Sequence, residues 1–357
     1  MKQMFSSLQA LAARLSTDAT AKADFVMPST QIVMNDDATI STPAFAATPA
    51  NETAHGQFAS TLDIPRAYYE RMRAADPALL AHNANAWLSR RDASERRMVR
   101  TNGTTVRALL SDRYQRIDNY EVAEVTLSEL EKVPGLRVVS SAVTESRLYI
   151  KAVSTDLVLP VAGSRRVGDM VEAGVMIRNS ETGQGSVSIQ PFAHFLVCTN
   201  GMVREKGSMR AAHVGRRIDA SIEGLLSEGT KRLEDEVVLR KVRDVIANAF
   251  DAQGFRAFID SLTATTQQQI EGNVHAAVEA LGPTLGLSGG ERQSVLRHLI
   301  TGGDLSRYGM LNAITRTAED VGSYDRATEI ETLGYRLVEL PGREWNAIAN
   351  AKALALA

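Results

Sequence analysis

The sequence predicts an α+β fold in which a central, mostly antiparallel β-sheet is flanked by helices and the C-terminal third is helical. Three observations support this class. Between about residues 95 and 210, apolar and polar side chains alternate with a period of two, as in strands with two different faces. Two Asn-Gly pairs, at 102–103 and 200–201, indicate hairpin turns in the same part of the chain. After residue 217, apolar residues recur every three or four positions, as on one face of a helix.

Length and composition indicate a globular protein with ample material for a core. The chain has 357 residues, of which 44% are hydrophobic and 23% charged. This length suits about two domains or one large α+β unit. We expect residues 1–60 to form an N-terminal helix and an irregular acidic segment. Residues 61–217 are expected to form an α+β core with a sheet platform, and residues 218–357 a helical region packed on it.

Cysteine content and charge limit the protein class further. The single cysteine excludes an intrachain disulfide and is typical of a reducing compartment, so we expect a cytoplasmic location. No apolar run approaches the roughly 20 residues that a membrane span requires, so no membrane association is expected. The net charge of −2 excludes a uniformly basic protein, but charge is sorted along the chain. Residues 90–116 hold eight arginines against three acids, residues 200–217 hold five basic residues against one acid, and residues 23–65 hold five acids and no lysine or arginine.

The first hundred residues predict helices and short strands. Apolar residues at helical spacing indicate a helix over about the first 15 residues, and residues 25–58 suggest an irregular or edge-strand region. A helix is expected over 64–75, because Pro65 suits a first turn. Asp76 and Pro77 then have the pattern of an N-cap and first helical residue, opening a second helix that runs towards Trp87 and Arg90.

The segment around Asn102 and Gly103 predicts a hairpin with a type I′ turn. This turn would place Val99 opposite Val106. The pleat would then put Arg96, Arg100 and Arg107 together on the other face, as a row of cations.

The remaining elements follow from the same signals. Asp118 or Asn119 is expected to cap a helix that ends before Pro134 and Gly135, and two strands follow between 136 and 153. More strands flank a polar turn at 179–185, and the nearly apolar run 192–198 suits a strand buried on both faces. A long helix is predicted over about 222–249, with further helices separated by glycine-rich turns.

Six segments resemble a known family when they are taken in this order: "LDIPRAYYERM", "RALLSDRYQRIDN", "IRNSETGQGSVSIQPF", "LVCTNG", "HVGR" and "GMLNAITRTAED". Together they resemble the phage- and plasmid-encoded family known as domain of unknown function 932, over roughly residues 60–325. The family has no assigned reaction. The resemblance therefore implies a setting, a mobile genetic element, in which DNA-handling, anti-restriction and recombination proteins are common.

The turn "NSETGQG" is a possible ligand loop. Asn179, Ser180 and Thr182 supply amide and hydroxyl groups, and Gly183 lets backbone N–H groups approach a ligand closely enough to bind a phosphate. The same composition also suits a plain turn between two strands, with no function of its own.

Cys198 has three interpretations. A lone cysteine in a buried strand is usually a small hydrophobic residue. A thiol enzyme would pair it with His194 or His213, although no orienting third residue is evident. A metal site is disfavoured because His194 and Cys198 would lie ~13 Å apart along a strand. Phosphate-binding loops and zinc-protease or hydrolase motifs are absent from the sequence, and we predict no catalytic residue, metal site or cofactor.

The basic clusters are the stronger signal, although each also suits a solvated face. Arginine outnumbers lysine, which favours bidentate contacts with phosphate, and Tyr114 between Arg113 and Arg116 suits stacking on a base. The predicted contacts with nucleic acid are Arg96, Arg100, Arg107, Arg113, Tyr114, Arg116, Arg204, Lys206, Arg210, His213, Arg216 and Arg217.

These observations predict a nucleic-acid-binding protein of a mobile element that acts on single-stranded DNA, in recombination or replication, as a possible homo-oligomer or ring. Annealing proteins of other families often form rings around a sheet with a basic groove, which is an analogy only. A thiol- or metal-dependent enzyme centred on Cys198 and His213 remains an alternative. A second alternative is a protein-interaction or anti-restriction factor whose acidic N-terminal segment imitates DNA.

Overall fold

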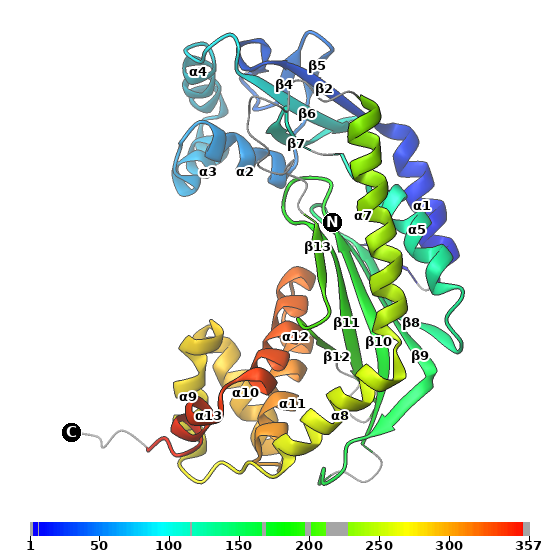
Figure 1. The fold of residues 1–357 in the computed structure, drawn as a ribbon. Helices are drawn as coiled ribbons and strands as arrows, with labels where there is room; N and C mark the ends of the chain where they lie inside the picture. Colours follow the sequence, from blue (N-terminus) through cyan, green and yellow to red (C-terminus); the bar gives the residue numbers. More distant parts are fainter. Residues whose placement is uncertain are drawn as a thin grey trace, which may run out of the picture.

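A computed structural model describes residues 3–5, 7–114, 116–165, 169–196, 201–211 and 228–352. A central sheet lies between an N-terminal lobe at one end and a group of C-terminal helices at the other (Figure 1). The sheets are antiparallel, and the described chain beyond residue 228 is helical. The predicted α+β class, with its helical C-terminal third, is confirmed.

The central sheet has the strand order β1-β8-β9-β10-β11-β12, and β13 also pairs with β11. Each pairing is antiparallel. The strands are β1 (Gln3–Phe5), β8 (Leu136–Val143), β9 (Leu148–Pro160), β10 (Met170–Asn179), β11 (Val187–Phe195), β12 (Gly201–Val203) and β13 (Met209–Ala211). Strands that follow one another in sequence thus lie side by side from β8 to β12, as hairpin connections predict.

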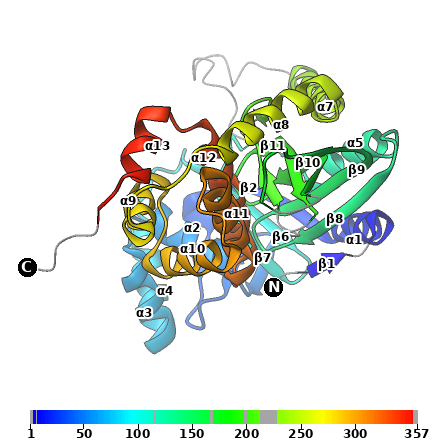
Figure 2. The same cartoon turned by 90° about the horizontal axis from the view of Figure 1, so that it is seen from below.

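One face of the central sheet is apolar. Ile150, Val175 and Ile189 point to this face together with their apolar neighbours and pack in one buried cluster. The helices that cover them are α1 (Leu8–Ala21), α5 (Asn119–Leu130) and α7 (Glu228–Ala249) (Figure 2). This layer provides the hydrophobic stabilisation of the sheet.

The opposite face, which we call the polar face, is also buried. It carries polar side chains beside a small apolar cluster of Val153, Met176, Phe192 and Val203. Lys151, Gln190 and His194 point to this side, and their exposed fractions are 7% or less. Helix α12 (Tyr324–Glu339) crosses it, and Glu331 of this helix contacts Lys151. The other C-terminal helices are α8 (Ala252–Thr266), α9 (Val274–Leu285), α10 (Gly289–Gly302), α11 (Arg307–Thr317), a short 3₁₀ turn (Ala318–Asp320) and α13 (Gly342–Ala349).

The N-terminal lobe has its own core around Phe58, Tyr69 and Leu80. Its larger sheet has the order β2-β6-β7, and β2 pairs along the whole of β6. The lobe comprises the strands β2 (Lys22–Pro28), β3 (Val33–Met34), β4 (Ile40–Thr42), β5 (Phe45–Thr48), β6 (Arg96–Asn102) and β7 (Thr105–Ser111), a 3₁₀ turn (Ser29–Gln31), and the helices α2 (Glu52–Thr61), α3 (Arg66–Ala75) and α4 (Pro77–Leu88).

Helix capping places several elements as the sequence predicts. Asp76 accepts a hydrogen bond from the Leu79 backbone N–H at 3.0 Å and starts α4. Glu121 accepts one from the Asp118 N–H at 2.8 Å and starts α5. Helix α2 lies in a segment predicted to be irregular or an edge strand, and β2 is indeed an edge strand. Among the helices that the structure describes, none is both long and apolar enough to cross a bilayer.

Candidate functional site

The hairpin of β6 and β7 differs in register from its prediction. Asn102 pairs with Thr105, so Gly103 and Thr104 form the turn, with Gly103 at φ +58°. Arg100 pairs with Ala108 but Thr101 pairs with Val106, which leaves Arg107 as an extra residue at a bulge. The predicted turn at Asn102-Gly103 and the predicted pairing of Val99 with Val106 are therefore wrong.

Arg100 is buried, with no exposed surface. Its guanidinium donates to Asp24 at 2.7 and 2.9 Å, to an oxygen of Asp118 at 2.7 Å, and to the backbone carbonyl of Glu181 at 2.7 Å. Burial by itself raises the pKa of Asp118, but the adjacent Arg100 outweighs this effect and holds that pKa below its usual range. The charge of Arg100 is thus fully used inside the molecule.

Arg107 ends in the same network. Its Nη1 donates to Glu181 Oε2 at 2.5 Å, and Lys22 Nζ donates to Glu181 Oε1 at 2.6 Å. The backbone N–H of Asn119, at the start of α5, donates to Glu181 Oε1 at 2.6 Å, where the helix dipole favours a negative charge. We call these three donors and the Glu181 carboxylate the Glu181 junction.

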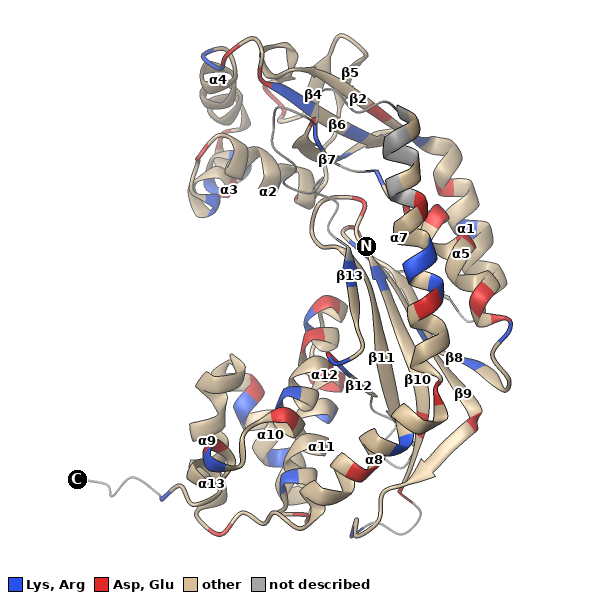
Figure 3. Ribbon diagram, in the orientation of Figure 1, with Lys and Arg blue, Asp and Glu red and all other residues tan. Residues whose placement is uncertain are grey.

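The predicted arginine face is therefore an internal ion network. Figure 3 shows the basic segments of β6 beside an acidic segment of β2, and β2 pairs with β6 so that Asp24 lies opposite Arg100. Arg100 has no exposed surface, Arg107 is only 6% exposed, and both are held by internal carboxylates, so the expectation that they contact phosphate is corrected. A buried cation must be paired, because leaving water without a partner costs several kcal/mol.

The predicted ligand loop belongs to the same region. Asn179, Ser180 and Thr182 are at most 3% exposed. Asn179 donates to the Ile117 carbonyl at 3.0 Å, and Ser180 donates to the Ser146 carbonyl at 2.7 Å. Gln57 of α2 donates to the Thr182 carbonyl at 2.6 Å. The loop joins the N-terminal lobe to the central sheet. Its Glu181 and Thr182 also line a pocket of about 300 Å³ beside Lys22 and Arg107, so the predicted ligand role of the loop stays a prediction.

Gly183 follows this pattern. It has φ +74°, and a Cβ there would lie 2.6 Å from Leu110 Cδ2. A glycine is required because the backbone takes a left-handed conformation against the lobe, and the requirement is one of packing rather than ligand approach.

The other predicted contacts differ in how exposed their side chains are. Tyr114 is half-buried and donates its hydroxyl to the Ser180 carbonyl at 2.7 Å, which corrects its predicted stacking role. Arg204 lies over the ring of Phe258, with Cζ 4.3 Å from the centroid, and burial lowers its pKa. The exposed members are Arg96, Arg113, Arg116, Lys206 and Arg210. Cys198, His213, Arg216 and Arg217 lie outside the described residues, so the thiol-enzyme alternative stays a prediction.

The acidic N-terminal segment is partly occupied as well. Asp24 pairs with Arg100, and Glu52 pairs with Arg66 at 3.2 Å and Arg73 at 2.6 Å. These two of its five acids are therefore neutralised within the lobe.

An aromatic groove on the N-terminal lobe was not predicted. It has a volume of about 570 Å³ and lies between the start of α3 and the end of α4. Trp87 and Tyr68 line it and are 48% and 47% exposed. The guanidinium carbon of Arg90 lies 5.3 Å from the Trp87 ring centroid. The sequence held a signal for it, because "WLSRR" places a tryptophan next to Arg90 and Arg91.

The polar face of the central sheet holds a second unpredicted feature, which we call the α12 cavity. It has a volume of about 290 Å³ and is lined by Lys151, His194 and Glu331, among other residues. Lys151 forms a short, buried ion pair with Glu331. Burial lowers the pKa of Lys151, but the Glu331 carboxylate outweighs burial and the pKa is raised, so the lysine is charged.

His194 enters this cavity from β11. Its Nδ1 lies 2.9 Å from Glu172 Oε2, and Arg137 contacts the same oxygen. Because an ionised carboxylate only accepts, Nδ1 carries the proton and donates. Burial lowers the pKa of His194 more than Glu172 raises it, so the ring is neutral near pH 7. The sequence gives no signal for this orienting partner, because Glu172 is 22 residues away and meets His194 only across the β10–β11 pair.

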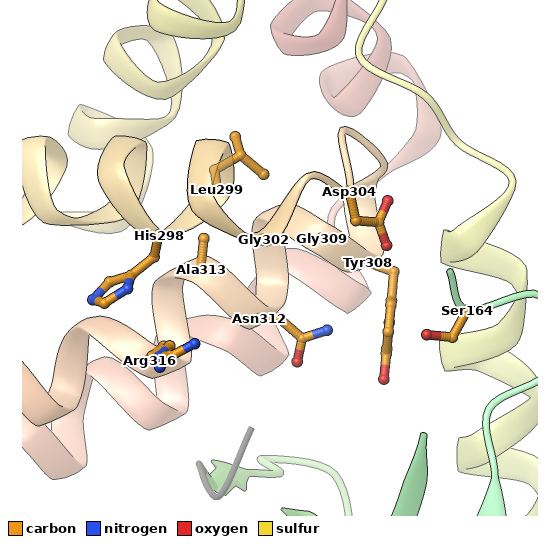
Figure 4. A pocket seen from close by; sticks show the side chains of 10 residues that line it. All are labelled: Ser164, His298, Leu299, Gly302, Asp304, Tyr308, Gly309, Asn312, Ala313 and Arg316. Atoms are coloured by element: carbon orange, nitrogen blue, oxygen red, sulfur yellow. The ribbon is translucent and has the colours of Figure 1, made fainter. Parts of the chain in front are cut away.

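A third pocket is too small for a ligand. It lies near α10 and α11, is lined by His298, Tyr308, Asn312 and Arg316, and has a volume of about 20 Å³ (Figure 4). This is room for a water molecule. Within the described parts of the chain, no group of three or more His, Cys, Asp or Glu residues is placed to hold a metal ion.

The family described as Domain of unknown function (DUF932) matches residues 107–336 of this chain. The chain belongs to this family. No curated protein matches it. No solved structure matches it either. The DUF932 segment runs from β7 into α12, so it contains Glu181 and every residue that lines the α12 cavity, whereas Tyr68 and Trp87 precede it.

Proposed function

We propose that this DUF932 protein binds single-stranded nucleic acid, with DNA favoured, and that unpaired bases stack on Trp87 and Tyr68. The observation that carries the proposal is a pair of large aromatic rings, each about half exposed, that line one groove on the N-terminal lobe. An aromatic side chain of this size is normally buried, because its exposure forgoes about 1.5–3 kcal/mol of hydrophobic stabilisation. Base stacking on such rings tolerates any sequence, since every base has a π face.

Two arginines, Arg90 and Arg91, line the groove against one acid, Asp63, and this positive balance supports the same function. Arg90 packs against Trp87, and a guanidinium in this position can contact a phosphate while it stacks. Asn83 also lines the groove and adds a polar side chain beside the two rings. The exposed Arg113, Arg116, Lys206 and Arg210 are further phosphate contacts in this proposal.

The biological setting is part of the proposal. The resemblance of the sequence to a phage- and plasmid-encoded family supports a role in a mobile genetic element, where single-stranded DNA arises during recombination and replication. A role in annealing or protecting such strands, as a monomer or an oligomer, follows from this setting together with the groove.

The chain offers its own probe, because it has two tryptophans in different environments. Trp87 is 48% exposed and Trp345 is 2% exposed. In a Trp345→Phe background, fluorescence reports Trp87 alone, and an added single-stranded oligonucleotide is expected to quench it. The logarithm of the affinity should fall linearly with the logarithm of the salt concentration, with a slope near −0.7 per phosphate contacted. Duplex DNA of the same length serves as a comparison.

Substitution then tests the groove itself. Trp87→Ala should weaken binding by about 1–3 kcal/mol, or roughly fivefold to 150-fold in Kd. Because this variant lacks the Trp87 fluorophore, its binding is measured by the anisotropy of a fluorescently labelled oligonucleotide. Leu79→Ala is the matched control, since Leu79 is an equally exposed apolar residue of the same helix that does not line the groove. Absence of binding at low salt would overturn the proposal, and equal affinities of Trp87→Ala and Leu79→Ala would remove the groove from it.

A further inference from the structure

The α12 cavity holds hydrogen-bonding groups that have no partner among the residues that the structure describes. A buried face of a sheet is normally apolar, and burying Lys151, Glu331, His194 and Glu172 together gains little stability over a hydrophobic layer. Groups of buried ionisable side chains that line a cavity are characteristic of ligand sites. The chemistry of this cavity should therefore indicate its ligand.

Two acceptors face the same space. His194 donates a hydrogen bond from Nδ1 to Glu172, so Nε2 of the neutral ring is an acceptor. No residue in the described part of the chain donates a hydrogen bond to this Nε2. Glu331 Oε2 accepts a hydrogen bond from the Lys151 ammonium, whereas Glu331 Oε1 has no partner among the described residues. Gly201 brings the two together, because it is the cross-strand partner of His194 and its Cβ would lie 3.5 Å from Glu331 Oε1.

Donors stand beside these acceptors. Lys151 carries an ammonium group, and the hydroxyls of Tyr324 and Ser140 lie 2.8 Å apart on the same wall. The Lys151 ammonium is 5.2 Å from the Tyr324 ring centroid and 5.7 Å from that of Phe192. The cavity thus places a pair of acceptors next to a cationic donor, with aromatic rings alongside.

Size and charge limit the ligand further. A volume of about 290 Å³ is at the lower end of small-molecule sites. The charged groups that line the cavity are Lys151, Glu319 and Glu331, which do not favour an anion, because Glu331 already neutralises the lysine. A neutral molecule that donates through an amino group and accepts beside it satisfies both the acceptors and the donor.

We propose that the α12 cavity binds an amino-bearing pyrimidine or purine base, with the amino group donating to His194 Nε2 and Glu331 Oε1 and a ring nitrogen or oxygen accepting from Lys151. Cytosine has this order of groups, whereas uracil presents a carbonyl oxygen where cytosine presents an amino group. The uracil carbonyl oxygen cannot form a hydrogen bond with His194 Nε2 or Glu331 Oε1, because all three are acceptors. Uracil binding is therefore disfavoured. The base can belong to a free nucleoside or to an unpaired nucleotide of a strand.

The test uses cytidine and uridine as probes of the full-length protein. Titration calorimetry is expected to show cytidine binding at least tenfold more tightly than uridine. Glu331→Gln should abolish this preference, because one of the two acceptor oxygens is replaced by an amide nitrogen. Glu329→Gln is the matched control on the same helix, since Glu329 is exposed and does not line the cavity.

A second measurement covers the case in which Glu331→Gln does not fold. In the wild-type protein, the ¹⁵N resonance of His194 Nε2 should shift when cytidine is added and stay in place with uridine. Failure of cytidine to bind at millimolar concentration, or equal binding of both nucleosides, would overturn the proposal.

Two further experiments ask whether the bound base is free or part of a strand, and whether its binding depends on the aromatic groove. Displacement of cytidine by oligo(dC) but not by oligo(dT) identifies the ligand as a base within a strand, and lack of displacement identifies it as a free nucleoside. Trp87→Ala should leave cytidine binding unchanged, because the groove and the cavity share no lining residue. The failure of one site is thus distinguishable from the failure of the other.

Discussion

Replacing Glu181 with glutamine should strongly destabilise the protein, because this carboxylate joins the N-terminal lobe to the central sheet. It accepts from Lys22 and Arg107 of the lobe and from the Asn119 N–H at the start of α5. The substitution keeps the shape of the side chain but removes its charge. We therefore expect a folded but much less stable protein rather than a rearranged one.

The size of the effect follows from burial. The side chains of Lys22 and Arg107 are 9% and 7% exposed, and both would face a neutral amide. Arg107 has no alternative hydrogen bond for its Nη2, which lies 3.8 Å from the nearest Asp24 oxygen. Breaking a buried ion pair on one side costs about 3–5 kcal/mol. In a protein of 357 residues that corresponds to a fall in Tm of roughly 4–7 °C.

Urea unfolding monitored by circular dichroism measures the loss directly. Glu131→Gln is the control, because Glu131 is exposed at the end of α5 and a surface change of this kind stays within about 0.5 kcal/mol. The difference should persist in 1 M salt, since buried charges are poorly screened. If Glu181→Gln unfolds at the same urea concentration as Glu131→Gln, the junction does not stabilise the fold and the argument from burial fails.

Two further predictions concern stability. His55 lies 2.9 Å from the Tyr69 hydroxyl, and burial lowers the pKa of His55 to about 4, so between pH 6.5 and pH 4 the unfolded state takes up a proton that the folded state does not. The free energy of unfolding should therefore fall by about 2 kcal/mol from pH 7 to pH 4.5 because of this histidine. In His55→Gln the fall over the same pH range should be smaller by this amount. Equal falls in the wild type and the variant would contradict the prediction. Arg307 donates to the carbonyls of Leu337, Val338 and Leu340 at the end of α12. Arg307→Lys should lower the free energy of unfolding by about 2–4 kcal/mol, because it leaves some of these carbonyls unpaired. The control Arg343→Lys changes an exposed residue and should cause no measurable change in the same thermal melt.

Much of the fold could be predicted from local signals. The alternation of Val187 and Ile189 with Ser188 and Gln190 predicts a strand with two different faces, and the structure puts the first pair in the apolar layer. Asp76 and Pro77 predict the start of α4, because a cap and a fixed φ act within one turn of the chain. Signals of this kind need no knowledge of distant residues, which is why they succeed.

The arginine face shows where such signals end. Alternation correctly indicates that Arg100 is on the polar side of its strand, but it cannot say what covers that side. The acids that neutralise Arg100 come from positions 24 and 118, and the one that meets Arg107 comes from 181. The bulge at Arg107 also changes the register that the turn alone implies. A sum of charges over a short window therefore overestimates the charge that reaches solvent.

The same reasoning applies to the polar face of the central sheet. On sequence alone, Lys151 alternates with apolar residues in the pattern of a solvent-facing position, yet α12 covers it and Glu331 pairs with it. A fold that needed only stability would place leucine or valine beneath α12, because a hydrophobic pair of the same volume is as stable as a buried ion pair or more so. Lys151→Met combined with Glu331→Leu should therefore keep or raise Tm while abolishing the preference for cytidine over uridine. A double variant that unfolds would instead assign the ion pair to the architecture, and the chemistry of the cavity would then need no ligand to explain it.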